Sequence, residues 1–185
     1  MASDLIQEQA YSDPVAIFGT DYAELQSFFQ NSFPPQHLSA QSWGLQETLT
    51  DLQKDNLYNS MLAAVGMTDQ DIFYSYTLAL SSSKDLVTVQ KMGLSDSTFV
   101  CDRRKGFSQI NTATKYRAAE HKLTALSRRL RDSFGHARIG AYGDYVLFED
   151  KKNRITGRII LKKDDLKTWK GVIEQYIADN GISIT

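Results

Sequence analysis

The clearest hydrophobic pattern in the chain lies in residues 111–134. Apolar side chains recur there at spacings of three and four, which is the period of one face of an α-helix. The repeating positions are Tyr116, Ala119, Leu123, Leu126, Leu130 and Phe134. Gly135 follows directly and is typical of a helix end. The pattern predicts a long amphipathic helix that starts at Asn111 or Thr112 and ends at Phe134.

A strand pattern follows this helix. Residues 145–148 and 155–161 are rich in aromatic and β-branched side chains, and a polar turn at 150–153 separates them. Together they predict a β-hairpin. Asp164 and Asp165 then supply the negative charge that favours a helix N-terminus, and apolar residues at helical spacing follow them. We therefore predict a C-terminal helix.

The pattern in the first part of the chain favours helices. Asp21 and Glu24 form an N-terminal helix signature, and apolar positions at helical spacing continue to Phe33. Two prolines then stop the helix. A second helix is predicted over residues 42–65, with Gly66 as its C-terminal stop.

The middle of the chain is less clear. Residues 68–71 can cap a third helix whose apolar face runs from 72 to 80, but the same apolar residues also alternate as in a strand. The cap favours the helix. Short β-branched or aromatic runs at 86–89 and 98–101 predict strands.

These elements together predict the α+β class. Residues 1–16 are expected to form a flexible arm, because Asp13 precedes a proline and that position disfavours helix. Residues 17–185 are expected to form one domain. Its helical half, 17–95, is acidic. Its basic half, 96–185, holds the long amphipathic helix, a β-hairpin or small antiparallel sheet, and the C-terminal helix.

Composition narrows the class of protein. The chain has 185 residues, of which 42% are hydrophobic, and no apolar run approaches the ~18 residues of a membrane span. The first residues lack the basic and apolar stretches of a signal or transit peptide. Cys101 is the single cysteine, which excludes an intrachain disulfide and a multi-cysteine metal site. We expect no membrane contact and a cytoplasmic or other reducing intracellular location.

The charge is balanced only in sum. The formal net charge is −1, but residues 1–100 hold 3 basic and 12 acidic side chains, whereas residues 101–185 hold 18 and 10. The halves therefore carry about −9 and +8. Such segregation can steer a polyanion to the basic half. It can equally mean that the two halves neutralise each other across an internal or a subunit interface.

A basic cluster occupies residues 102–138. On a helical wheel, its charged residues between 115 and 131 lie along both edges of the apolar stripe, where they can contact phosphates or simply extend from the rim of a core face. The hairpin adds basic residues interleaved with aromatic ones, a mixture typical of single-stranded nucleic-acid sites. The predicted nucleic-acid-binding residues are Arg103, Arg104, Lys105, Lys115, Arg117, Lys122, Arg128, Arg129, Arg131, Arg138, Tyr142, Lys151, Lys152, Arg154 and Arg158.

Enzymatic signatures are weak. The three histidines lack the helical spacing of a zinc site, no Gly-x-Ser-x-Gly elbow occurs, and the glycines at 135, 140 and 143 fit a turn better than a phosphate loop. Asp144, Glu149 and Lys151 faintly resemble the acid and lysine set of metal-dependent nucleases. We predict no catalytic residue, no metal and no cofactor.

Three functional hypotheses follow. The first is a non-enzymatic protein that binds nucleic acid, preferably single-stranded, through the basic helix and hairpin. The second is a protein-interaction or self-assembling structural protein, such as an adaptor, inhibitor or coat-like subunit, whose acidic N-terminal half binds a protein partner or another copy. The third is a small metal-dependent nuclease.

Overall fold

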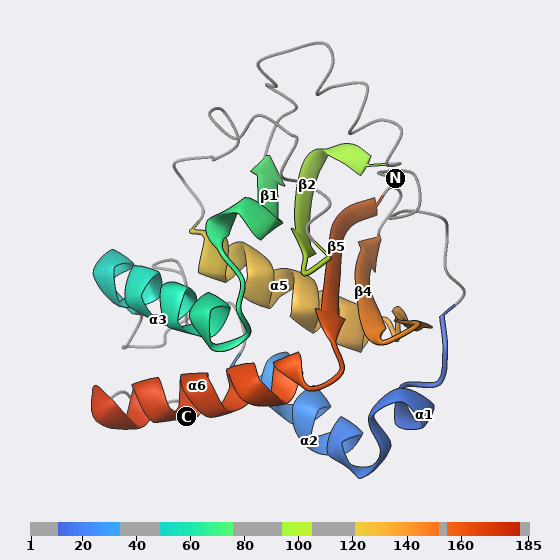
Figure 1. Cartoon of the computed structure of the whole chain (residues 1–185), viewed down its shortest axis with the longest axis horizontal. Helices are drawn as coiled ribbons and strands as arrows, with labels where there is room; N and C mark the ends of the chain where they lie inside the picture. The colour runs from blue at the N-terminus through green and yellow to red at the C-terminus, as the bar shows by residue number, and fades with distance from the viewer. Residues whose placement is uncertain (1–10, 34–48, 76–93, 105–120, 152–154, 182–185) are drawn as a thin grey trace.

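A computed structural model describes residues 11–33, 49–75, 94–104, 121–151 and 155–181. It shows a five-stranded mixed sheet in the order β1-β2-β5-β4-β3, with helices packed against it (Figure 1). The predicted α+β class is confirmed.

The sheet combines strands from both halves of the chain. β1 (Ile72–Ser75) pairs antiparallel with β2 (Leu94–Asp102), which runs parallel to β5 (Ile155–Lys162). β4 (Tyr145–Lys151) pairs antiparallel with β5 and with β3 (Ile139–Tyr142). The predicted hairpin is therefore confirmed as β4–β5, and the expected strand at 98–101 lies within β2.

The described helices are α1 (Pro14–Phe18), α2 (Tyr22–Ser27), α3 (Asp51–Ala64), α5 (Lys122–Gly135) and α6 (Asp165–Asp179). Figure 1 shows α5 crossing one face of the sheet, with α2, α3 and α6 further from the strands. A short turn of 3-10 helix precedes α2 and a π-helical turn, η3 (Phe28–Ser32), extends it. The helical segment predicted after Asp21 is thus present in two short pieces, α2 and η3.

The core fills the space around α5. Leu123, Leu126, Leu130 and Phe134 are buried together with Val146, Phe148, Ile159 and Leu161 of the sheet. We call the strand surface with these core residues the first face and the opposite surface the second face. The Ser127 hydroxyl donates to the Phe33 carbonyl, and the Trp169 indole of α6 donates to the Met61 carbonyl of α3. These bonds join the helices to one another.

Two helices begin later than predicted. α3 begins after Thr50, whose hydroxyl accepts from the Gln53 backbone N–H while the Gln53 side chain accepts from the Thr50 backbone. This reciprocal cap fixes the helix start. α5 begins after His121, which has an extended backbone and accepts from the Leu123 N–H. Residues 42–48 and 111–120 of the two predicted helices lie outside the described residues.

The prediction of a helix after residues 68–71 is wrong. Thr68 caps only the 3-10 turn η5 (Asp69–Asp71), because the Asp71 carboxylate folds back to accept from the Thr68 N–H. Ile72 then adopts an extended backbone and starts β1. The alternating pattern was therefore the better guide, with Ile72 and Tyr74 in the core. Residues 76–80 and the strand predicted at 86–89 lie outside the described residues.

The end of the predicted arm is ordered. Asp13 caps α1 by accepting from the Val15 N–H, and Pro14 occupies the first helical position, where its missing N–H costs nothing. Ile17 enters the core, and the Ser12 N–H donates to the Ile139 carbonyl of β3. Residues 1–10 lie outside the described residues.

Gly157→Ala tests how closely α5 approaches the sheet. A Cβ at Gly157 would lie 2.8 Å from Cδ and 2.9 Å from Cγ of Arg129, whose side chain is held in place. We expect the substitution to lower the free energy of unfolding by about 1–3 kcal/mol, as overpacking does. Urea denaturation measures this. Gly171→Ala, in an open position of α6, is the control and should stabilise by up to about 1 kcal/mol. Equal effects of the two substitutions would contradict the close approach.

Candidate functional site

Arg129, one of the predicted nucleic-acid contacts, lies inside the fold. The residue is 4% exposed, and its Nη1 donates to the Asp150 carboxylate and, at 2.7 Å, to the Thr156 hydroxyl. The reason is that its edge of α5 faces β5 at Gly157, where the missing side chain leaves room for the guanidinium stem. A polyanion outside this structure cannot reach it, so Arg129 is not part of the interface proposed below.

Arg158 is also buried, on the second face. It is 2% exposed, and its Nε donates to Oε2 of Glu149 on β4 at 2.9 Å. The two residues are direct partners across the strands. The Tyr11 hydroxyl donates to the other oxygen, Oε1, of the same carboxylate. Glu149 is therefore satisfied on both oxygens within the chain.

Four further predicted contacts have a carboxylate partner in the described structure. The pairs are Arg103–Asp165, Arg104–Asp102, Lys122–Asp69 and Arg131–Asp132. Arg103 also donates to the Val65 carbonyl, so it joins the end of α3 to the start of α6. Arg104 lies 6.0 Å from the ring centre of Tyr145. With Arg129 and Arg158, six of the predicted basic residues are paired internally.

Three ion pairs and one hydrogen-bond contact connect the acidic half with the basic half in the described structure. The ion pairs are Lys122–Asp69, Lys167–Asp21 and Lys170–Glu24, and the contact joins His121 and Asp55. Lys170 also pairs with Glu174 of its own helix, and these two carboxylates raise the pKa of Lys170. The charge segregation seen in the sequence is thus partly neutralised inside one chain.

Two partly exposed basic residues lie near the end of the sheet where β4 leads into β5. We call Arg138 and Lys151 the basic edge. Lys151 ends β4, and the Arg138 carbonyl accepts from the Glu149 N–H beside it. Arg128 lies on α5 and is partly exposed. Arg138 and Lys151 form no ion pair with any carboxylate of the described residues.

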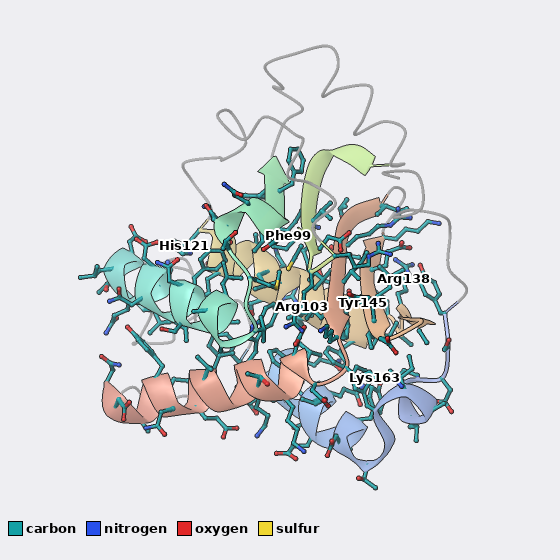
Figure 2. All side chains as sticks on the ribbon, in the orientation of Figure 1. Phe99, Arg103, His121, Arg138, Tyr145 and Lys163 are labelled. Carbon is teal, nitrogen blue, oxygen red and sulfur yellow. The ribbon has the colours of Figure 1, made fainter. Side chains whose placement is uncertain are left out.

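Arg138 has one further unusual feature. Its Nη1 is buried and has no hydrogen-bond partner within the part of the chain that the structure describes. A buried donor without a partner costs about 1–3 kcal/mol. The Arg138 N–H donates to the Ser133 carbonyl, and the preceding residue, Ala137, has a left-handed backbone with φ of 52°. Figure 2 shows Arg138 at the outer side of β4.

Part of the predicted set cannot be placed. The structure does not describe Lys105, Lys115, Arg117, Lys152 and Arg154, nor the side chain of Tyr142.

Sequence reasoning missed Tyr11, which lies in the predicted arm. No local pattern connects it with Glu149, 138 positions away.

Asp144 and Glu149, the acids of the nuclease hypothesis, do not lie together. Asp144 is exposed in the turn before β4. Glu149 lies five residues further along the strand, where it is buried and paired with Arg158. Five residues of strand span about 16 Å, too far for two ligands of one cation. No group of metal-ligating side chains occurs among the described residues. Cys101 is fully buried, and burial raises its pKa, so the thiol is an inert core residue.

Comparison with known proteins identifies no relative of this chain. No family model, no curated protein and no solved structure matches the chain. Within the described residues, no helix combines the length and the apolar character needed to cross a membrane.

The Tyr11 contact predicts an unusual titration. Partial burial and the hydrogen bond to Glu149 raise the pKa of Tyr11 to about 12, while Arg138 and Arg158 act in the opposite direction. Because this pKa is higher in the folded than in the unfolded chain, the contact stabilises the fold fully below pH ~10 and loses its effect as the pH rises through 12.

NMR of ¹³C-labelled tyrosines, with Tyr11→Phe for assignment, measures this pKa. We expect Glu149→Gln to shift it down towards 10, because the charged acceptor is lost. Asp144→Asn, a charge change in the exposed turn before β4, should leave it in place. An ordinary pKa for Tyr11 in the unmodified chain would contradict the contact.

Proposed function

We propose that this chain is a non-enzymatic protein that binds nucleic acid, preferably single-stranded, through the basic edge. The interface is smaller than the one expected from the sequence. It leaves out Arg129 and Arg158, which are buried, and centres on the outer part of β3, β4 and β5.

The observation that carries the proposal is the local excess of positive charge. The described charged residues of this region are Arg129, Arg138, Lys151 and Arg158 against Glu149 and Asp150. Each of these two carboxylates is paired with a guanidinium group. The four positive charges therefore exceed the negative ones by two. The sequence continues directly with Lys152 and Arg154 after Lys151.

A nucleic-acid backbone suits such a surface. It presents regularly spaced monoanionic phosphates, and each phosphate that a lysine or arginine neutralises releases a counterion and strengthens binding at low salt. Single strands are favoured because the described edge shows no helix placed to enter a groove, as α5 is buried along most of its length.

The competing proposal, a protein-interaction or self-assembling protein, loses part of its basis. Its main argument was that the acidic and basic halves need each other across a subunit interface. Three ion pairs between described residues already join those halves within one chain. It remains an outcome of the experiment below.

Lys151→Ala is the direct test of the basic edge. We expect it to weaken binding of a fluorescently labelled single-stranded oligonucleotide on the order of fivefold, and to reduce the slope of log affinity against log salt by about 0.7, the value for one phosphate contact on a single strand. Fluorescence anisotropy at several salt concentrations measures both quantities. Lys163→Ala is the matched control, because Lys163 is exposed at the opposite end of the hairpin (Figure 2).

The outcomes separate the hypotheses. Loss of affinity with Lys151→Ala but not with Lys163→Ala supports the basic edge. No binding of DNA or RNA at low salt overturns the proposal. If light scattering on the same sample then shows an oligomer that salt dissociates, self-assembly takes its place.

A further inference from the structure

His121 joins the start of α5 to helix α3. It occupies the N-cap of α5, where its Nδ1 accepts from the Leu123 backbone N–H at 3.0 Å. Its Nε2 lies 2.6 Å from Oδ1 of Asp55 on α3. The ring also packs perpendicular to that of Tyr58, and in Figure 2 the residue lies where α5 begins beside α3. One imidazole therefore serves two helices, through a different nitrogen for each.

These two contacts determine where the imidazole carries its proton. A backbone N–H can only donate, so Nδ1 must present a lone pair and no proton while it caps α5. The single proton of the neutral ring then lies on Nε2 and is donated to Asp55. The cap thus requires the neutral form of His121, whereas the contact with Asp55 is available to the neutral and to the protonated form.

Protonation of His121 affects its two contacts in opposite directions. A proton on Nδ1 places a donor against the Leu123 N–H, so the cap is lost. The new charge also lies at the N-terminus of α5, where the helix dipole and the neighbouring Lys122 disfavour a cation. Asp55, in contrast, then faces a full positive charge, which strengthens that contact.

The groups around the ring confine this effect to the first turn of α5. The titratable groups placed there are Asp55 and Tyr58 of α3, Asp69 of η5 and Lys122 of α5 itself. Asp69 accepts from the Tyr58 hydroxyl at 3.1 Å and from the Lys122 ammonium group. These two contacts hold α3, η5 and α5 together in both protonation states of His121.

We propose that His121 is a pH-dependent helix cap. In its neutral form it orders the first turn of α5, which consists of Lys122, Leu123 and Thr124, and in its protonated form it releases that turn while it stays bound to Asp55. Histidine is the side chain whose ordinary charge change falls between about pH 5 and 8, so the device responds within the cellular range. The proposal does not depend on nucleic-acid binding.

Amide hydrogen exchange of Leu123, followed by NMR on the full chain, is the direct test. It is measured at about pH 8 and about pH 5, and each rate is divided by the intrinsic rate of an unstructured amide at the same pH. We expect the protection of Leu123 to fall about fivefold at the lower pH, the effect of one lost cap. The Gln53 N–H, which the Thr50 hydroxyl caps at the start of α3, is the internal control and should keep its protection.

His121→Asn is the matched variant, because asparagine caps a helix but does not titrate in this range. It should give Leu123 the same protection at both pH values. His121→Ala, which caps at neither pH, should show the low protection at both. Asp55→Asn tests the second contact. Because it removes the charge that favours protonated His121, the change in Leu123 protection should move to lower pH.

Each contrary result overturns the proposal. Protection of Leu123 that is equal at the two pH values in the unmodified chain does so. A ring ¹⁵N spectrum that places the proton of neutral His121 on Nδ1 contradicts the cap itself. A pH-dependent loss of protection that His121→Asn retains shows that another group titrates. If His121→Ala does not fold, the comparison of the unmodified chain with His121→Asn decides.

Discussion

The buried guanidinium group of Arg129 fixes how the central helix sits on the sheet. A charge inside a protein is tolerated only when it is paired, and removing one partner of such a pair typically costs about 3–5 kcal/mol. Arg129 finds its partners in Asp150 and Thr156 at the two sides of the β4–β5 connection. Its stem passes over Gly157, the one place on β5 without a side chain. Sliding α5 along the sheet would break these contacts together.

The elements that sequence reasoning predicted well are those with strong local signals. The β4–β5 hairpin and α6 have clear periodicity and clear turn or cap residues, and both appear with nearly the expected bounds. β1 was missed because a good cap at Thr68 was read as a helix start. In the structure that cap serves one 3-10 turn, and pairing with β2 decides the conformation of Ile72. Local sequence cannot report a pairing with a strand some twenty-five residues away.

The candidate site was harder to predict, because counting charges does not reveal which charges are already paired. Arg129 and Arg131 look alike in the sequence, yet one is in the core and the other half-exposed. The helical wheel placed Arg129 at the edge of the apolar stripe, but it could not show that this edge faces a glycine. Arg158 alternates with Ile159 as a solvent-facing residue would, and only the second face, where Leu147, Val100 and Ile160 are also buried, makes it internal.

The second face therefore carries a polar row beside buried apolar residues, and the charges in this row do not cancel. Tyr11 cannot supply the missing negative charge, because its raised pKa keeps the hydroxyl protonated at physiological pH. It acts as a hydrogen-bond donor to Glu149 and leaves the electrostatic balance unchanged. Among the described residues, no carboxylate pairs with Arg138. Most of the basic residues in the described part of the chain are paired internally, whereas Arg138 and Lys151 at the basic edge are not.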